Sequence, residues 1–322
     1  MHSLAMRERQ ASELHGHPMT SNPRIPFVLS TDRSPLPAPD GKNIIVHLVV
    51  NVENWRFDSA MPRKLLTAPH GKDSVPDVPN FSWAEYGMRC GMPRIMDLLT
   101  ELNLPSSCAL NAGVIANYPR LSDRILEMGW EIIGHGLHQK ALSAEVSEEE
   151  IIAEAIDKIE AFTGVDMKGW LGPGLRESPD TPDILKAHGV RYCCDWVLDD
   201  LPVWMETRHG PLIAMPYSLE INDSVLHAVQ HNPSDELYER TVATLATFEA
   251  ERHLGPRIMA IGLHPHLIGV PHRLGAFRRT LELLCDRSDT IFMTGNQIAD
   301  WYEQHEPSSQ AAMPHSLSQA IS

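Results

Sequence analysis

The chain has 322 residues, a mass of 36.0 kDa and a formal net charge of -15. A chain of this length can bury a full core, and it fits one large α/β domain. The negative charge argues against nucleic acid or an anionic membrane surface as a partner, because both bind basic patches.

Targeting and redox signals are sparse. No run of about 18 apolar residues occurs, so we expect no membrane span. The charged start, residues 1–10, has no apolar segment after it, which excludes an ordinary secretory signal. The five cysteines form no CxxC pair, and an odd count favours reduced thiols in a cytoplasm. We therefore expect a cytoplasmic protein.

The two ends differ in composition from the middle. Residues 1–42 hold many prolines and little apolar periodicity, which predicts an extended arm lying on the domain or on a neighbouring subunit. Such an arm favours a homo-oligomer. The catalytic domain is predicted over residues 43–305, and the Ser, Gln, Ala and Pro-rich tail 306–322 is predicted to be disordered.

Strand and helix patterns alternate through the domain. The sequence predicts strands over residues 43–51, 106–111, 130–134, 167–171, 190–196, 212–216, 257–263 and 290–293. It predicts helices over residues 84–102, 118–128, 147–162, 182–188, 234–252 and 275–285, and from residue 297. Pro93 is expected to kink the first helix or to mark a new start, and a capping box is predicted to open the third at Ser147. This alternation implies parallel strands with right-handed crossovers, and we expect an α/β fold, a distorted (β/α) barrel of about seven strands. The Pro-rich residues 55–82 are too long for a simple connection and are predicted to form a functional loop over the strand ends.

Polar residues gather where three predicted strands end. Asn51, Glu53 and Asn54 close the first strand, a Gly-His-Gly turn around His135 closes the third, and His264 follows the strand 257–263. In parallel strand-helix proteins the reacting groups collect at this edge. We therefore predict one hydrolytic site, with Glu53 as a base or metal ligand.

The segment after the third strand offers donors for a metal. His135 and His138 are three residues apart, and His135 and Gln139 are four apart, so a helical turn would bring them to one face. A histidine at a strand end also serves as a capping hydrogen-bonding group. The expected cofactor is one divalent metal, zinc or manganese, held by Glu53, His135, His138 and Gln139, with a metal-free mechanism as the alternative.

Three further residues are candidates for catalysis. Pro265 fixes the chain after His264, which favours His264 as the proton donor to a leaving nitrogen. Asp195 is predicted to orient a catalytic histidine, the alternative being a helix cap. Arg176, or the backbone N–H groups of the loop before it, is predicted to stabilise a developing oxyanion, although a turn alone would explain that loop.

The expected partner is a small-molecule substrate. Substrate contacts are predicted from residues at strand ends and in loops, namely Asn51, Trp55, Pro173, Trp196, Glu220 and Asn222.

Together these motifs resemble the NodB-homology polysaccharide deacetylase superfamily, over about residues 43–302. The matching stretches are Asn51–Asn54, His135–Gln139, Leu171–Pro173, Asp195–Trp196 and Leu263–Pro265. The resemblance implies a distorted barrel, a base and a metal ligand in the first stretch, and two metal ligands in the second.

Departures from the family pattern narrow the resemblance. Asn54, Gln139 and Leu171 stand where the family places two metal ligands and an arginine. The first motif reads Asn-x-Glu and the next reads Gly-His-Gly, and both resemble the branch of the allantoinases without a urease-type metal centre and of the cyclic imide hydrolases. That branch implies a hydrolase that opens a C–N bond in a small cyclic amide, imide or ureide. The alternatives are an N-deacetylase of a polysaccharide or amino sugar and a catalytically inactive binding homologue.

Overall fold

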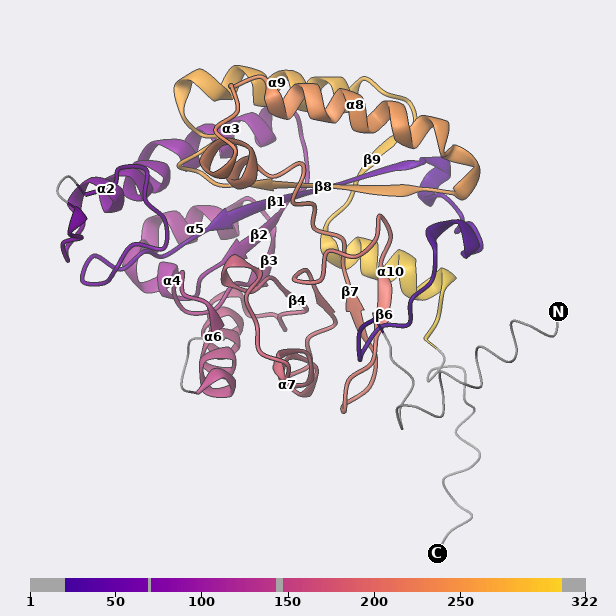
Figure 1. Cartoon of the computed structure of the whole chain (residues 1–322), viewed down its shortest axis with the longest axis horizontal. Helices are drawn as coiled ribbons and strands as arrows, with labels where there is room; N and C mark the ends of the chain where they lie inside the picture. Colours follow the sequence, from indigo (N-terminus) through magenta and orange to yellow (C-terminus); the bar gives the residue numbers. More distant parts are fainter. Residues whose placement is uncertain (1–20, 69–70, 143–146, 309–322) are drawn as a thin grey trace, which may run out of the picture.

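A nine-stranded sheet organises the molecule. The computed structural model describes residues 21–68, 71–142 and 147–308. The strands follow the order β6-β7-β5-β4-β3-β2-β1-β8, with β9 also paired to β1 (Figure 1). Their bounds are β1 Ile44–Val52, β2 Ser107–Leu110, β3 Glu131–Gly134, β4 Gly169–Trp170, β5 Tyr192–Cys193, β6 Val203–Met205, β7 Leu212–Ala214, β8 Arg257–Leu263 and β9 Thr290–Phe292.

The sheet is parallel and curls into a half-barrel. Every strand pairing is parallel except that of β6 with β7. Between the outer strands β6 and β8 no ladder forms within the described residues, and Asn222 instead makes a single bridge to Gly262 of β8. The α/β fold of distorted barrel type predicted from the sequence is therefore confirmed, although the sheet has nine strands rather than about seven and is not fully closed.

Helices cover the outer side of this sheet. They are α2 Val78–Tyr86, α3 Met92–Glu101, α4 Gly113–Asn117, α5 Pro119–Glu127, α6 Glu148–Thr163, α7 Thr181–Ala187, α8 Glu236–Ala250, α9 Pro271–Cys285 and α10 Gly295–His305. Helices α8 and α9 lie side by side over β1 and β8 (Figure 1). None of the helices in the described ranges is both long and apolar enough to cross a membrane.

Successive side chains of strand β1 point to opposite faces of the sheet. All nine of its residues are buried, as expected for a parallel strand covered on both faces. Side chains alternate along a strand, so Val46 and Val50 join the core under the outer helices, whereas Ile45 and Val49 join the core inside the curl. Asn51 continues this inward-facing row toward the carboxyl edge.

The predicted helical segment 84–102 divides at a π-helical turn, Gly87–Gly91, and α3 begins at Met92 with Pro93 in its first turn, so the predicted new start at Pro93 is confirmed. A Cβ on Gly91 would lie 2.1 Å from the carbonyl oxygen of Pro265, so only glycine allows this close backbone packing. Ser147 precedes α6 but makes no side-chain capping bond, so the predicted capping box is wrong.

The described part of the predicted arm packs on the domain. Ile25 and Leu36 are buried, Arg33 forms an ion pair with Asp199 at 3.1 Å, and the indole of Trp301 donates to the Pro37 carbonyl at 2.9 Å. The rest of the predicted arm, residues 1–20, and most of the predicted tail, residues 309–322, lie outside the described residues.

Candidate active site

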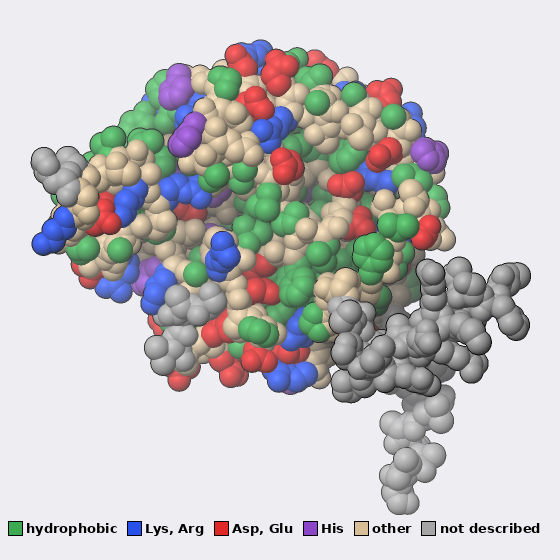
Figure 2. All heavy atoms as spheres, viewed as in Figure 1, with side chains coloured by type: hydrophobic (Ala, Val, Ile, Leu, Met, Phe, Trp, Pro, Cys, Tyr) green, Lys and Arg blue, Asp and Glu red, His purple; other side chains and the backbone are tan. Residues whose placement is uncertain are grey.

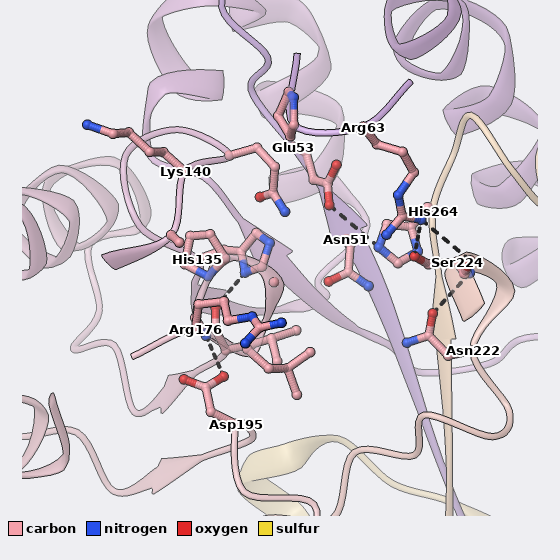
Figure 3. Close-up of a pocket in the computed structure, with 18 of the residues that line it drawn as sticks. Asn51, Glu53, Arg63, His135, Lys140, Arg176, Asp195, Asn222, Ser224 and His264 are labelled. Atoms are coloured by element: carbon pink, nitrogen blue, oxygen red, sulfur yellow. Dashed lines mark hydrogen bonds and ion pairs between the residues drawn. The ribbon is translucent and has the colours of Figure 1, made fainter. Parts of the chain in front are cut away.

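The carboxyl ends of β1, β3 and β8 open into a pocket of about 880 Å³ (Figure 3). Glu53, His135 and His264, which are far apart in the sequence, all line it. Its other charged or hydrogen-bonding side chains come from Asn51, Trp55, Arg63, Gln139, Lys140, Arg176, Asp195, Tyr217, Asn222, Ser224 and His266.

His264 is held by one carboxylate and faces another. Oδ2 of Asp223 accepts the backbone N–H of His264 at 2.7 Å, and Oδ1 lies 2.6 Å from its Nδ1. Nε2, on the far side of the ring, lies 3.5 Å from Oε1 of Glu53. Asp223 is completely buried and thus fixes both the backbone and the ring of His264.

This environment favours the protonated imidazole. Burial lowers the pKa of His264, but the charge of Asp223, its hydrogen bond and the charge of Glu53 outweigh burial, so the net pKa is raised above 6.5. With Nδ1–H donated to Asp223, the second proton sits on Nε2 and faces the pocket. His264 is thereby arranged as a general acid.

The carboxylate of Glu53 is held from the opposite side. Its Oε2 accepts the indole N–H of Trp55 at 2.6 Å. The Trp55 ring packs edge-on against His266, with centroids 5.3 Å apart, and Trp83 packs against the same imidazole at 4.6 Å. Burial and the charge of His264 hold the pKa of His266 well below its usual value, so His266 serves here as a neutral aromatic wall.

His135 offers a lone pair to the pocket. Its Nδ1 contacts the carbonyl oxygen of Leu171, which requires a proton on that nitrogen. Burial lowers the pKa of His135, so the neutral ring carries its lone pair on Nε2. Nε2 is buried and makes no hydrogen bond within the described residues, and the same holds for Oε1 of Gln139.

An amide and a phenol complete the floor. The Asn51 side-chain N–H₂ group donates to the hydroxyl of Tyr217 at 3.0 Å and to the Leu263 carbonyl at 3.2 Å. Both amide protons are thus used, and the amide oxygen of Asn51 points into the pocket (Figure 3). Asn222 supports this arrangement by donating to the same Tyr217 hydroxyl at 3.1 Å.

Two residues of this site were missed by the sequence reasoning. Asp223 is one of them, because nothing in its local sequence links it to His264. Arg63 belongs to the long 55–82 loop and donates to the hydroxyl of Ser224. Its positive charge acts against protonation of both His264 and His266, so it lies near the reacting groups.

Three expected roles are corrected. The carboxylate that orients His264 is Asp223, whereas Asp195 lies on another wall and accepts the Gly172 N–H at 2.7 Å (Figure 3). Trp196 does not line the pocket, because its indole N–H donates to Glu177 at 2.6 Å. Glu220 also lies outside the pocket; its side chain is 79% exposed and pairs with Arg240. Trp55, Pro173, Arg176 and Asn222 line the pocket as expected, and their roles stay predictions.

The predicted metal ligands are not gathered into one set. Nδ1 of His138 lies 2.7 Å from Nδ2 of Asn54, and Glu53 is engaged by Trp55. Within the described residues, Glu53, His135 and His138 do not bring ligand atoms within 4.8 Å of one another, so the predicted ligands form no metal site.

A different cluster could hold a metal ion. Glu177, Cys193 and Asp195 place ligand atoms within 4.8 Å of one another, the one such group of His, Cys, Asp and Glu in the described ranges. Burial raises the pKa of all three, so the cluster also retains protons strongly. A metal bound here would have to displace them.

Comparison with known proteins places this pocket in a family context. Residues 83–193 match the family model for polysaccharide deacetylase. This match confirms the predicted resemblance to polysaccharide deacetylases of the NodB type within residues 83–193.

Two solved structures share nearly the whole fold. The crystal structure of Puue allantoinase is 26% identical, covers 91% of this chain and 99% of its own, and superposes with a TM-score of 0.79. A probable polysaccharide deacetylase from Pseudomonas aeruginosa PAO1 is also 26% identical, covers 86% and 97%, and gives a TM-score of 0.78. Among curated proteins, a putative polysaccharide deacetylase of Schizosaccharomyces pombe is 25% identical over 84% of this chain and 93% of its own length.

Proposed function

We propose that this protein hydrolyses a C–N bond in a small cyclic amide, imide or ureide. The observation that carries the proposal is the alignment of Asp223, His264 and Glu53, with the imidazole between two carboxylates. This arrangement places a general base, Glu53, and a general acid, His264, side by side, as amide hydrolysis requires. The structural similarity to an allantoinase supports a ring as the substrate.

The reaction proceeds in two proton transfers. Glu53 takes a proton from a water molecule, whose oxygen attacks the ring carbonyl carbon and forms a tetrahedral oxyanion. His264 then gives its Nε2 proton to the ring nitrogen as the C–N bond breaks. The products are a carboxylic acid, which ionises in water, and a free amine, amide or urea nitrogen on the opened ring.

The oxyanion has a cation within reach. Arg63 contacts Ser224, next to Asp223, and its charge acts on His264. Its guanidinium is therefore placed to stabilise the developing negative charge, the role that we expected of Arg176. The amide oxygen of Asn51 is placed to accept a ring N–H, which would orient the carbonyl toward Glu53.

The 55–82 loop supports the proposal of a small ring as the substrate. Trp55 and Arg63 both come from the 55–82 loop and line the pocket together with residues of the strand ends, so this loop forms one wall of the site. The test is a panel of hydantoins, succinimides and allantoin with purified protein, followed by mass spectrometry for addition of one water. Failure to open any ring at millimolar concentration would contradict the proposal.

The second candidate is N-deacetylation of an amino sugar or polysaccharide, favoured by the family match over residues 83–193. It uses the same base and acid, so only the substrate separates the two. Acetate release from chitooligosaccharides without ring opening would favour it. A catalytically inactive homologue would bind cyclic amides or chitooligosaccharides without hydrolysing them.

Metal use and assembly are part of the same proposal. Elemental analysis of the wild type, Cys193→Ala and His138→Ala tests the metal; we expect only Cys193→Ala to lower any bound zinc or manganese. We also propose a cytoplasmic homo-oligomer, which native mass spectrometry and fractionation of cells test.

A further inference from the structure

Arg176 has no use in the chemistry just described. It follows the turn Pro173–Leu175 and lines the pocket across from His264 and Arg63 (Figure 3). Its guanidinium makes no hydrogen bond and no ion pair with any residue in the described part of the chain. An arginine that faces a pocket with all its donors unused is suited to a planar anion.

Glu177, which follows Arg176 in the sequence, and Asp195, which lines the same pocket, each use one carboxylate oxygen in a bond to another residue. Oδ1 of Asp195 accepts the Gly172 N–H at 2.7 Å, and Oε1 of Glu177 accepts the Trp196 indole at 2.6 Å. These two acids also lie within 4.8 Å of each other. Neither forms an ion pair with Arg176, so its charge is left for a ligand.

The side chains that line the pocket are more basic than acidic, whereas the whole chain is acidic. The protein carries -15, yet the pocket is lined by three basic side chains, Arg63, Lys140 and Arg176, and by two acidic ones, Glu53 and Asp195. Figure 2 shows both blue and red side chains around the hollowed part of this face. A locally basic pocket attracts an anionic ligand, whereas the acidic remainder of the protein surface repels it.

We propose that Arg176 binds an anionic substituent, a carboxylate, on the ring of the substrate. The inference rests on the proposed function for the identity of the ring, and it adds a subsite on the wall opposite the acid and base. Two parallel N–H···O bonds from the guanidinium would hold such a carboxylate and turn the ring carbonyl toward Glu53. The substrate class is then a cyclic amide or ureide that carries a carboxylate.

The test compares hydantoin-5-acetate with its neutral methyl ester. Calorimetry measures the binding of both probes to the wild type, Arg176→Gln and Arg176→Lys. We expect the wild type to bind the acid at least tenfold more tightly than the ester, Arg176→Gln to lose this preference, and Arg176→Lys to keep part of it. Arg89→Gln, at an exposed position outside the pocket, should match the wild type.

The outcomes separate the subsite from the reaction. Equal binding of acid and ester by the wild type, an unchanged preference in Arg176→Gln, or no binding of either probe at about 10 mM ligand would each overturn the subsite. Opening of neutral rings with no preference for the acid would leave the proposed function standing. A preference for the acid that depends on Arg176, without ring opening, would keep the subsite and contradict the hydrolysis.

Discussion

Asp223 and His264 are joined through two atoms of each: one carboxylate oxygen takes the backbone N–H at 2.7 Å, and the other lies 2.6 Å from the ring nitrogen. The carboxylate therefore sets both where the imidazole sits and how basic it is. Asp223→Asn should keep the backbone bond, because the amide oxygen still accepts, but should remove the charge. We expect kcat/KM to fall by about 10²–10⁴-fold, the usual contribution of general acid–base catalysis.

The fold of that variant should survive, and this can be checked separately. Circular dichroism and the thermal midpoint of Asp223→Asn report on folding, while the titration of His264 by NMR reports on its pKa. A raised pKa of His264 that persists in Asp223→Asn would contradict the assignment.

The pH dependence of activity follows from the same pair. The pKa of His264 is raised above 6.5 in the folded protein, so the acid form is present below that pKa and is lost as the pH rises through it. Activity should therefore fall on the alkaline side. The stability that the charged ring contributes has the same direction: it is complete below pH 6.5 and is lost as the pH rises through the folded-state pKa.

Two variants test whether the titration of His264 causes the alkaline fall in activity. Asp223→Asn should move the alkaline fall in kcat/KM to lower pH. Glu177→Gln removes another group whose pKa is raised, by burial and by Asp195, and should leave the alkaline fall in place. If Glu177→Gln shifts the alkaline fall in kcat/KM and Asp223→Asn does not, the fall does not come from His264.

Trp55 is a positioning residue for Glu53. Trp55→Phe removes the indole N–H that holds Oε2 at 2.6 Å but keeps a ring against His266. A hydrogen bond to a charged group contributes about 1.5 kcal/mol, so kcat should fall by about tenfold with little change in KM. A rise in KM alone would instead indicate that Trp55 acts by contacting substrate.

The Leu263–His266 turn depends on close packing against Gly91. A methyl group at Gly91 would meet the Pro265 carbonyl at 2.1 Å, so Gly91→Ala should destabilise the protein by about 1–3 kcal/mol and lower activity with it. Gly275→Ala is the matched control. That glycine lies in α9, where an added Cβ meets only the Arg279 side chain at 3.8 Å, so helix propensity should stabilise the variant by up to about 1 kcal/mol. Denaturant unfolding measures both; equal effects would refute the packing argument.

The sequence anticipated the parts of this site that sit at the ends of regular strands. The apolar run of β1 and its period of two place Asn51 inward, and the buried run of β8 leads directly to His264. Parallel strands end at one edge, so Glu53, His135 and His264 were expected in one place from pattern alone.

The errors fall where the chain is irregular. Asp223 follows a stretch with no repeating pattern, and its contact with His264 spans 41 residues, so only the tertiary fold reveals it. The expected partner, Asp195, also follows a strand, but β5 lies four strands away from β1 in the sheet order, on another wall of the pocket. Glu220 and Asn222 were both predicted to contact substrate, yet the side chain of Glu220 faces solvent and that of Asn222 donates a hydrogen bond to Tyr217.

Single-turnover ring opening by the wild type, Glu53→Gln and His264→Ala tests the central claim most directly. With a cyclic ureide at saturating concentration and mass spectrometric detection of the product, we predict that the wild type adds one water to the ring. Each variant should lose at least about 10²-fold in rate while it still binds the ring. Ring opening at the wild-type rate by either variant would contradict the account.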